Sequence, residues 1–355
     1  MSLRHRGHDL ANPTPPKLRR DSRVWYRNPA LANRHCCQRA SMRSLSILLA
    51  SPRGFCAGVE RAIQTVEESL TRFGAPVFVR HQIVHNPWVV AGFAAKGAVF
   101  VEELDQVPDG APIVFSAHGV AKSVRSEAGR RRLPQIDATC PLVTKVHREV
   151  EHHTGAGRKI ILIGHAGHPE VVGTMGQAPS GSVILVQSAA EAAAVPVEES
   201  VSYGLVTQTT LSVMDAEEIT AILRHRISKL HEPSKSDICY ATTNRQSAVA
   251  AIAPRCDAVI VIGGSNSSNS RRLVEIACDA GCRKAILIES VEGLDPFFLN
   301  GVTTLGITSG ASTPEVLVIE LIEHLSDHFE VSVEEIAIAT EDLRFRVPVS
   351  ATQSD

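Results

Sequence analysis

Residues Ser46-Ile-Leu-Leu-Ala50 form a short apolar run, and Gly54-Phe-Cys56-Ala-Gly-Val-Glu60 follows it at the start of a helical pattern. Two more cysteines have the same setting, Cys140 after the run at 136–139 and Cys239 after the run at 236–238. A thiolate at such a position is favoured by the positive end of the helix dipole and by any metal that it binds. The recurrence indicates one metal centre held by three domains.

Short β-rich runs alternate with helical patterns along the rest of the chain. We expect strands at 46–50, 77–79, 112–116, 159–164, 182–186, 204–207, 258–263, 284–288 and 303–308. We expect helices at 59–73, 141–153, 216–230, 246–255, 269–280 and 314–325. This order is typical of parallel α/β sheets with right-handed crossovers.

The three cysteines are 84 and 99 residues apart, which is the size of a small domain. The sequence therefore predicts the α/β class, with three small parallel-sheet α/β domains around a common centre. The expected domains are 58–140, 141–238 and 239–326, and 45–57 supplies a first strand and a cysteine loop that pack with the third domain. We expect 1–44 to be a disordered extension or an upstream start assigned in place of Met42, with a transit peptide as the alternative, and 327–355 to be a C-terminal tail.

Composition excludes several classes of protein. Of 355 residues 44% are hydrophobic, which is ample for buried cores. Residues 1–44 carry ten Lys and Arg against two Asp, whereas the rest carries 26 Lys and Arg against 36 Asp and Glu. An acidic body argues against a nucleic-acid partner. No apolar run approaches the roughly 20 residues that span a bilayer, so we expect no membrane partner and a cytoplasmic protein. Eight widely spaced cysteines then suggest metal binding or burial rather than disulfides.

Polar loops follow five of the expected strands, at 116–119, 164–170, 207–210, 263–270 and 308–315. In open parallel sheets ligands bind beyond the carboxyl ends of the strands. Gly, Ser, Thr and Asn at these turns offer hydroxyl and N–H donors to an anion such as phosphate. Each loop alone is more simply a helix cap, but five together favour an anion site. The Walker and Gly-x-Gly-x-x-Gly patterns are absent, so neither ATP nor a nicotinamide cofactor is indicated.

Three separated cysteines suit an unusual metal centre. Structural zinc sites and electron-transfer clusters normally use closely spaced cysteine pairs or runs, which are absent here. Three thiolates can ligate three irons of a cubane and leave the fourth iron free to bind a substrate oxygen and pass electrons into its C–O bond. The leaving oxygen needs a proton, and Glu170 in the Gly167-His-Pro-Glu170 loop is our candidate acid. Cys256, Cys278 and Cys282 are expected to be structural thiols.

Eight motifs together resemble the 4-hydroxy-3-methylbut-2-enyl diphosphate reductases, the last enzymes of the non-mevalonate isoprenoid pathway. The resemblance runs from about Met42 to Pro348. The motifs are Pro52-Arg-Gly-Phe-Cys56, Val84-His-Asn-Pro87, Ser116-Ala-His-Gly119, Asp137-Ala-Thr-Cys-Pro141, Gly167-His-Pro-Glu-Val171, Thr207-Gln-Thr-Thr-Leu-Ser212, Cys239-Tyr-Ala-Thr-Thr-Asn-Arg-Gln246 and Gly263-Gly-Ser-Asn-Ser-Ser-Asn-Ser270.

The resemblance implies a trefoil of three α/β domains around one [4Fe-4S] cluster per chain, with Cys56, Cys140 and Cys239 as its ligands. It implies reductive removal of the substrate's allylic hydroxyl, giving isopentenyl and dimethylallyl diphosphates, with ferredoxin or flavodoxin as electron donor. Glu170 would deliver protons, aided by Thr209. The residues implied to hold the diphosphate substrate are His85, His118, His168, Thr209, Ser267, Ser268, Asn269 and Ser312.

Two other functions remain open from the residues themselves. A zinc-binding interaction module with three Cys and one His predicts a colourless protein. A cubane-dependent hydro-lyase predicts dehydration that needs no reductant. The sequence carries no signature of the product ratio, the oligomeric state or the choice between the two electron donors.

Overall fold

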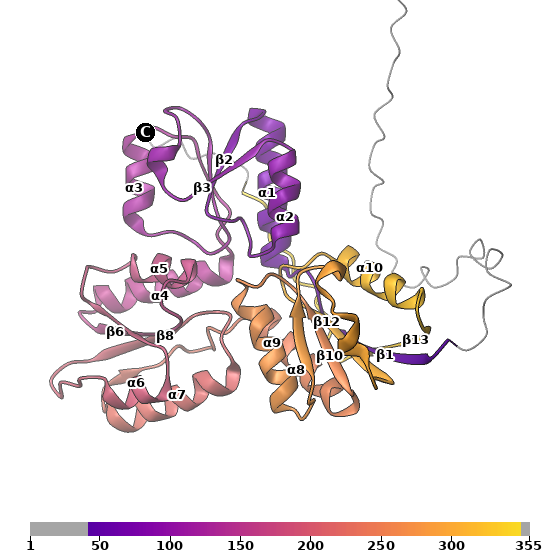
Figure 1. Cartoon of the computed structure of the whole chain (residues 1–355). Coiled ribbons are helices and arrows are strands. Elements are labelled where there is room, and N and C mark those ends of the chain that lie inside the picture. The colour runs from indigo at the N-terminus through magenta and orange to yellow at the C-terminus, as the bar shows by residue number, and fades with distance from the viewer. Residues whose placement is uncertain (1–41, 349–355) are drawn as a thin grey trace, which may run out of the picture. The chain divides into compact units, whose positions relative to one another are not determined.

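The computed structural model describes residues 42–348. This part of the chain forms three parallel β-sheets with helices packed on them, which confirms the predicted α/β class (Figure 1). The expected extension at 1–44 lies almost entirely outside the described residues, as does the end of the expected tail. Among residues 42–348, none of the helices combines the length and the hydropathy that a bilayer crossing requires.

One sheet has the strand order β3-β2-β4-β5. Its strands are β2 (Val77–Arg80), β3 (Ala98–Val101), β4 (Ile113–Phe115) and β5 (Gln135–Asp137). Its helices are α1 (Ala57–Phe73), α2 (Pro87–Ala95), α3 (Lys122–Arg130) and the short η2 (Leu104–Gln106). Alternate residues of β2 face opposite sides: Val77 and Val79 share a core with α1 and α2, and Phe78 shares one with α3. Both faces of the sheet are therefore covered.

A second sheet has the order β7-β6-β8-β9. Its strands are β6 (Lys159–Ile163), β7 (Val183–Val186), β8 (Tyr203–Thr207) and β9 (Leu230–His231). Its helices are α4 (Pro141–Gly155), α5 (Pro169–Met175), α6 (Ala189–Ala194) and α7 (Val213–Arg226). Ile161 on β6 packs with α6 and α7, whereas Ile160 and Leu162 pack with α4 and α5. Burial on both faces explains why this strand is a continuous apolar run.

The third sheet has the order β11-β10-β12-β1-β13. Its strands are β1 (Ser44–Ser51), β10 (Ala258–Ile262), β11 (Ala285–Ile288), β12 (Thr304–Ser309) and β13 (Glu330–Ala337). Its helices are α8 (Tyr240–Ile252), α9 (Ser268–Asp279) and α10 (Glu315–Ser326), with short turns η3 (Ala253–Arg255), η4 (Val291–Gly293) and η5 (Pro296–Leu299). Ile260 on β10 packs with α10, and Val259 and Val261 pack with α8 and α9.

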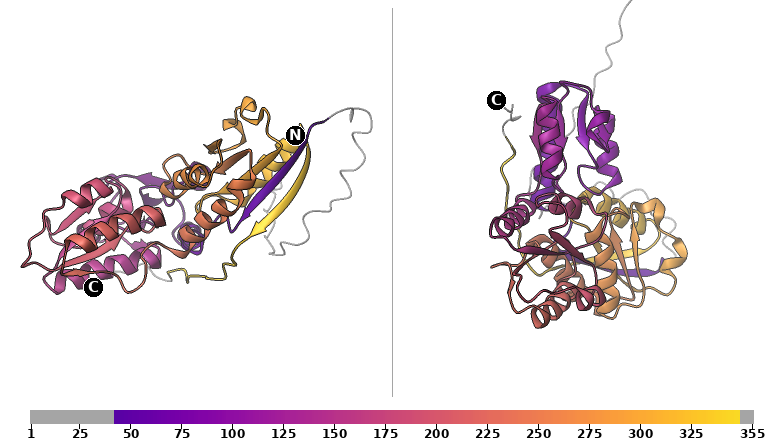
Figure 2. Two further views of the ribbon diagram at one scale, coloured as in Figure 1. Left: turned by 90° about the horizontal axis from the view of Figure 1, so that it is seen from below. Right: turned by 90° about the vertical axis from the view of Figure 1, so that its left-hand side faces the viewer.

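The first strand and the last strand of the described chain are neighbours. Strand β1 pairs in parallel with β12 on one side and with β13 on the other, as the indigo and yellow strands in Figures 1 and 2 show. Strand β13 lies within 327–355, which was expected to be a C-terminal tail. Half of its residues are polar, and all of its positions are half-buried or exposed, as is usual at a sheet edge, which is why no strand is evident from the pattern.

The division into domains is a proposal that the sheets support. Each expected range, 58–140, 141–238 and 239–326, contains the consecutive strands of one sheet, and β1 and β13 join the third sheet. Helix α8 begins at Tyr240, six residues before the expected helix, and so begins directly after Cys239.

Candidate active site

The three cysteines hold equivalent positions in the fold. Cys56, Cys140 and Cys239 are the N-cap residues of α1, α4 and α8, and each is a free, half-buried cysteine. Local sequence explains two of these helix starts. Pro141 stands at the first helical position after Cys140, where its missing N–H costs nothing, and the sulfur of Cys239 accepts from the amide of Thr242.

Each cysteine is also anchored to a polar loop at the end of a strand. The amide of Cys56 donates to the carbonyl of Ala311 at 3.2 Å, that of Cys140 to Ala117 at 3.0 Å, and that of Cys239 to Thr209 at 3.1 Å. These acceptors lie next to Ser312 and His118 or are themselves in the predicted substrate set. The backbone thus brings the thiols and the polar loops into one region.

Two of the sulfurs converge on Gly58. A Cβ at that residue would come within 2.6 Å of the Cys140 sulfur and 3.8 Å of the Cys56 sulfur, so only glycine fits there. Burial, followed by the nearby Cys56, raises the pKa of Cys140 to about 12. Burial and Cys56 also raise the pKa of Cys239 to about 11. The free thiols of Cys140 and Cys239 are protonated at neutral pH, and a bound metal would supply the positive charge that their thiolates need.

The chemistry of the three cysteines is that of cluster ligands. Among residues 42–348, no three Cys, His, Asp or Glu side chains converge on a point that one metal ion could occupy. Ligands of a cubane bind different irons, so thiols that arrive from three helix ends need not converge on a point. The donor set therefore fits a cluster with three protein thiolates.

Three predicted histidines form a compact group. The ring centroids of His85 and His118 are 4.1 Å apart, those of His85 and His168 are 5.2 Å apart, and those of His118 and His168 are 5.8 Å apart. The Nδ1 atom of His168 accepts from the amide of Glu170 at 3.1 Å, which leaves Nε2 as the protonated nitrogen. Neither ring nitrogen of His85 has a hydrogen-bond partner among residues 42–348, although both are buried.

The histidines are uncharged in the free protein. Burial lowers the pKa of His85 to about 4 and that of His168 to about 3, and it holds the pKa of His118 well below its usual range. Repulsion from His85 lowers the pKa of His118 and His168 further. A buried imidazole without a partner is costly, which is a reason to expect a ligand that accepts from it.

The loop at the start of α9 approaches the same histidines. Ser267 caps the helix by accepting from the amide of Ser270, and Asn269 follows in the first turn. Both polar atoms of the Asn269 side chain are buried and have no hydrogen-bond partner within the described part of the chain. The hydroxyl of Ser312 donates to the carbonyl of His85 at 2.9 Å, and a Cβ at Gly264 would come within 2.7 Å of that carbonyl oxygen. These contacts join the loops after β10 and β12 to His85.

Glu170 and Thr209 form a buried pair. One carboxyl oxygen of Glu170 accepts from the Thr209 amide at 2.6 Å, and the other accepts from the Thr209 hydroxyl at 2.9 Å. Burial raises the pKa of Glu170 to about 7, although both hydrogen bonds act to lower it. The carbonyl of Thr209 accepts a hydrogen bond from the amide of Cys239, so this threonine connects Glu170 to a cysteine.

Sequence reasoning missed two arginines beside the cysteines. Arg245 is fully buried and donates to the carbonyl of Gly54, and Arg61 donates to the carbonyl of Thr139. A signal for Arg245 exists, since it lies on the buried face of α8 with Ala241 and Ile252. The expected helix began too late to show this pattern.

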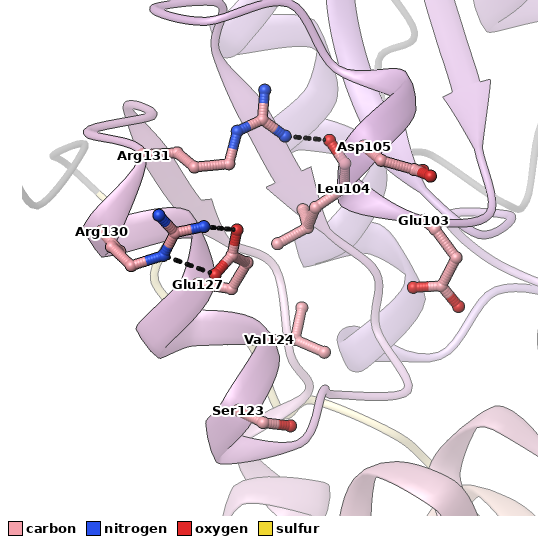
Figure 3. Close-up of a pocket in the computed structure, with 8 residues that line it drawn as sticks. All are labelled: Glu103, Leu104, Asp105, Ser123, Val124, Glu127, Arg130 and Arg131. Carbon is pink, nitrogen blue, oxygen red and sulfur yellow. Dashed lines mark hydrogen bonds and ion pairs between the residues drawn. The ribbon is translucent and has the colours of Figure 1, made fainter.

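Two hollows in the surface differ in how they lie relative to this region. The pocket in Figure 3, about 650 Å³, lies between η2 and α3, and in its wall Glu127 accepts from Arg130 while Arg131 donates to the carbonyl of Leu104. None of its lining residues is a predicted site residue. A hollow of about 330 Å³ instead adjoins the predicted set, with Gly164, Thr210, Ser268 and Arg271 in its wall.

Known proteins are similar in sequence to most of this chain. A sequence profile of the family described as LytB protein matches residues 47–326. A 4-hydroxy-3-methylbut-2-enyl diphosphate reductase of Gluconobacter oxydans is 56% identical over 310 residues, which cover 86% of this chain and 92% of that relative.

Two solved structures are similar as well. The E-1-hydroxy-2-methyl-but-2-enyl-4-diphosphate reductase of Plasmodium falciparum has 37% identity and a TM-score of 0.82, over 86% of this chain and 96% of that one. An (E)-4-hydroxy-3-methyl-but-2-enyl diphosphate reductase, described as the terminal enzyme of the non-mevalonate pathway, has 32% identity and a TM-score of 0.58, over 80% and 99% of the two chains. The chain therefore belongs to the LytB protein family, the 4-hydroxy-3-methylbut-2-enyl diphosphate reductases, and is an oxidoreductase.

Proposed function

We propose that this enzyme carries out the last step of the non-mevalonate pathway. It takes 4-hydroxy-3-methylbut-2-enyl diphosphate, two electrons and two protons, breaks the allylic C–O bond and releases water with isopentenyl or dimethylallyl diphosphate. The observation that carries the proposal is the buried, unpartnered polar set of His85 and Asn269 in the region where the three cysteine loops meet. Such groups require a polar ligand, and a diphosphate supplies many acceptor oxygens.

The diphosphate would be held by donors that are neutral in the free protein. His85, His118 and His168 supply imidazole N–H groups, and the start of α9 adds the hydroxyls of Ser267 and Ser268 and the amide of Asn269. Thr209 and Ser312 complete the set. The positive end of α9 favours an anion at this place, and binding would satisfy the buried amide of Asn269.

Cys56, Cys140 and Cys239 would hold one [4Fe-4S] cluster per chain. When bound, the cluster would supply a Lewis-acidic iron without a protein ligand and a relay for electrons from ferredoxin or flavodoxin. The glycine at 58 leaves the space that the Cys56 and Cys140 sulfurs need. We propose a cytoplasmic location, in keeping with free cysteines and small acidic electron carriers.

Glu170 would give the proton to the leaving hydroxyl. Its carboxyl group is buried, and its pKa of about 7 keeps a large fraction protonated at neutral pH. The Thr209 hydroxyl, 2.9 Å from the carboxyl group, would orient the acid and pass its proton to the substrate side. Water exclusion by the surrounding loops would keep this proton from exchanging during the step.

Replacement of the cysteines tests the cluster and the reaction together. Cys56→Ser, Cys140→Ser and Cys239→Ser should each abolish iron incorporation, the brown absorbance at roughly 400 nm and turnover with a one-electron reductant. Cys278→Ser, on the surface, and Cys256→Ser and Cys282→Ser, in the core of the third sheet, should keep near-normal iron content. Full iron retention in Cys140→Ser would reject the assignment. Turnover without any reductant would identify a hydro-lyase, and a colourless zinc protein would identify a binding module.

A further inference from the structure

The C-terminal arm, residues 330–348, touches the cysteine loops through three arginines. It consists of β13 and the segment that follows it. Its contacts are Glu335 with Arg53, Glu341 with Arg245 and the carbonyl of Arg346 with Arg61. Each arginine also donates to a backbone carbonyl near Cys56 or Cys140, so the arm is joined to both loops by short chains of hydrogen bonds.

Arg245 is the most buried of the three. Its guanidinium group, 0% exposed, donates to the carbonyl of Gly54 at 2.7 and 3.2 Å, and Gly54 lies two residues before Cys56. Its counter-ion is Glu341 of the arm, at 3.0 Å, which Asn244 also contacts at 3.1 Å. A buried guanidinium group that loses its counter-ion is strongly destabilised, so the arm determines whether Arg245 can remain beneath the Cys56 loop.

Arg61 contacts the loop that precedes Cys140. It lies on α1 and donates to the carbonyl of Thr139 at 2.8 Å and to that of Asp137 at 3.2 Å, directly before Cys140. Its remaining nitrogen donates to the carbonyl of Arg346 at 2.9 Å. The planar guanidinium group thus holds three backbone carbonyls at once, which a lysine ammonium group on its flexible stem does not reproduce.

Arg53 fixes the start of the Cys56 loop. It contacts Glu335 of β13 at 2.9 Å, the carbonyl of Ala50 at 3.2 Å and the carboxylate of Glu315. Gly54 then adopts a φ of +70°, and a Cβ there would lie 3.3 Å from the Thr313 carbonyl. The loop is therefore tightly constrained on the side that faces β13 and α10.

We propose that the C-terminal arm is a clamp that positions Cys56 and Cys140, with Arg245 and Arg61 as positioning residues. The inference rests on the proposed function, because the two cysteines matter as cluster ligands. The arm supplies the counter-ion of Arg245 and one of the three carbonyls that Arg61 contacts. The two arginines in turn hold the carbonyls of Gly54 and Thr139, which precede Cys56 and Cys140 and so set the direction of the two thiols. Outer contacts of this kind usually control how firmly a metal centre is held.

The test is the rate at which the intact holoprotein loses its cluster to a chelator, followed anaerobically by visible absorbance and iron content. Glu341→Gln keeps the size of the side chain and removes its charge, and Arg61→Lys keeps the charge and removes the three-way contact. Both variants should lose the cluster about 10- to 100-fold faster than the unaltered protein. Glu334→Gln is the matched control, since this neighbour on β13 only forms an exposed pair with Arg255 at 3.2 Å. It should lose its cluster at the unaltered rate.

A second measurement separates the clamp from general stability and from the cluster assignment. Alkylation of Cys56 and Cys140 in the apoprotein, read by mass spectrometry below the unfolding transition, should be faster in Glu341→Gln, in Arg61→Lys and in a chain ending at Ile338. Cys278 should react at its usual rate. Unchanged rates of cluster loss and alkylation in folded variants would overturn the clamp and leave the proposed function intact. If the unaltered protein takes up no iron, the proposed function fails, and the alkylation rates alone decide whether the arm positions the two thiols.

Discussion

Burial and hydrogen bonding act in opposite directions on the carboxyl group of Glu170. Two hydrogen bonds from Thr209 favour the charged form, yet burial outweighs them and raises the pKa from an ordinary 4.5 to about 7. The nearby carboxylate of Asp237 adds to the rise. A group in this state can hold a proton at neutral pH and still release it, which is what a general acid must do.

Glu170→Gln should therefore slow the reaction and abolish the dependence of its rate on pH. The protonated fraction of Glu170 falls as the pH rises through about 7, so the single-turnover rate should fall over the same range. The glutamine side chain has no acidic proton to give, so the single-turnover rate of this variant should be lower by a factor of about 10²–10⁴. Its rate should not fall as the pH rises through about 7. Iron content and substrate binding should be unchanged. A near-normal rate per cluster would move the proton source to Thr209, to the substrate's own diphosphate or to water.

The histidines should couple substrate binding to proton uptake. In the free protein the pKa is about 4 for His85 and about 3 for His168, whereas a bound diphosphate favours the charged rings and raises both. Between the free and the bound pKa values, affinity should increase as the pH falls. Calorimetry in buffers of different ionisation enthalpy measures the protons taken up.

Loss of one such donor has a predictable effect on affinity. His85→Ala should weaken substrate binding by about 1.5–3 kcal/mol, the usual range for a hydrogen bond to a charged group. His118→Ala should behave similarly because its ring centroid lies 4.1 Å from that of His85. Unchanged affinity in both variants would place the diphosphate elsewhere.

At the level of helices and strands, helix α2 connects local stability to the site. Asn86 caps it by accepting from the amide of Val89 at 3.1 Å, and Asn86 directly follows His85. Asn86→Ala should lower the free energy of unfolding by about 0.5–2 kcal/mol, measured by denaturant titration, and should also weaken substrate binding. Ser188→Ala removes the exposed cap of α6, where Ser188 accepts from Glu191 at 3.2 Å, and it should leave substrate affinity unchanged. Equal effects of the two variants on affinity would contradict a link through His85.

The elements that the sequence predicts best are those with strong periodicity. Strand β6 is a continuous buried apolar run, and α1 has an amphipathic pattern that begins at Cys56, so both are evident from sequence. Strand β13 is not, because its pairing with β1 depends on residues almost 290 positions away and its own pattern is half polar. Motif residues such as His168 and Glu170 are predictable as candidates, but the role of Arg245 depends on Glu341, which no local pattern connects to it.

On the scale of the whole molecule, the catalytic apparatus should not depend on the N-terminal extension. The family profile begins at residue 47, and the candidate site residues lie between 56 and 312. A chain that begins at Met42 should keep its iron content and its turnover with the same reductant. An insoluble or inactive product would show that residues 1–41, which lie outside the described structure, belong to the working protein.

The central place of β1 has a consequence for synthesis. This strand leads into Cys56, but its two partners, β12 and β13, are the last strands of the described chain. At an ordinary translation rate of about 5–20 residues per second, β1 waits on the order of 15–60 s on the ribosome before residue 337 is made. During that interval both of its edges can pair with other chains. Cys56 is therefore the first of the three candidate ligands to be made, yet its loop gains its last contacts only once Glu341 has been added, so we expect iron loading to follow the emergence of the C-terminal arm rather than accompany the growing chain.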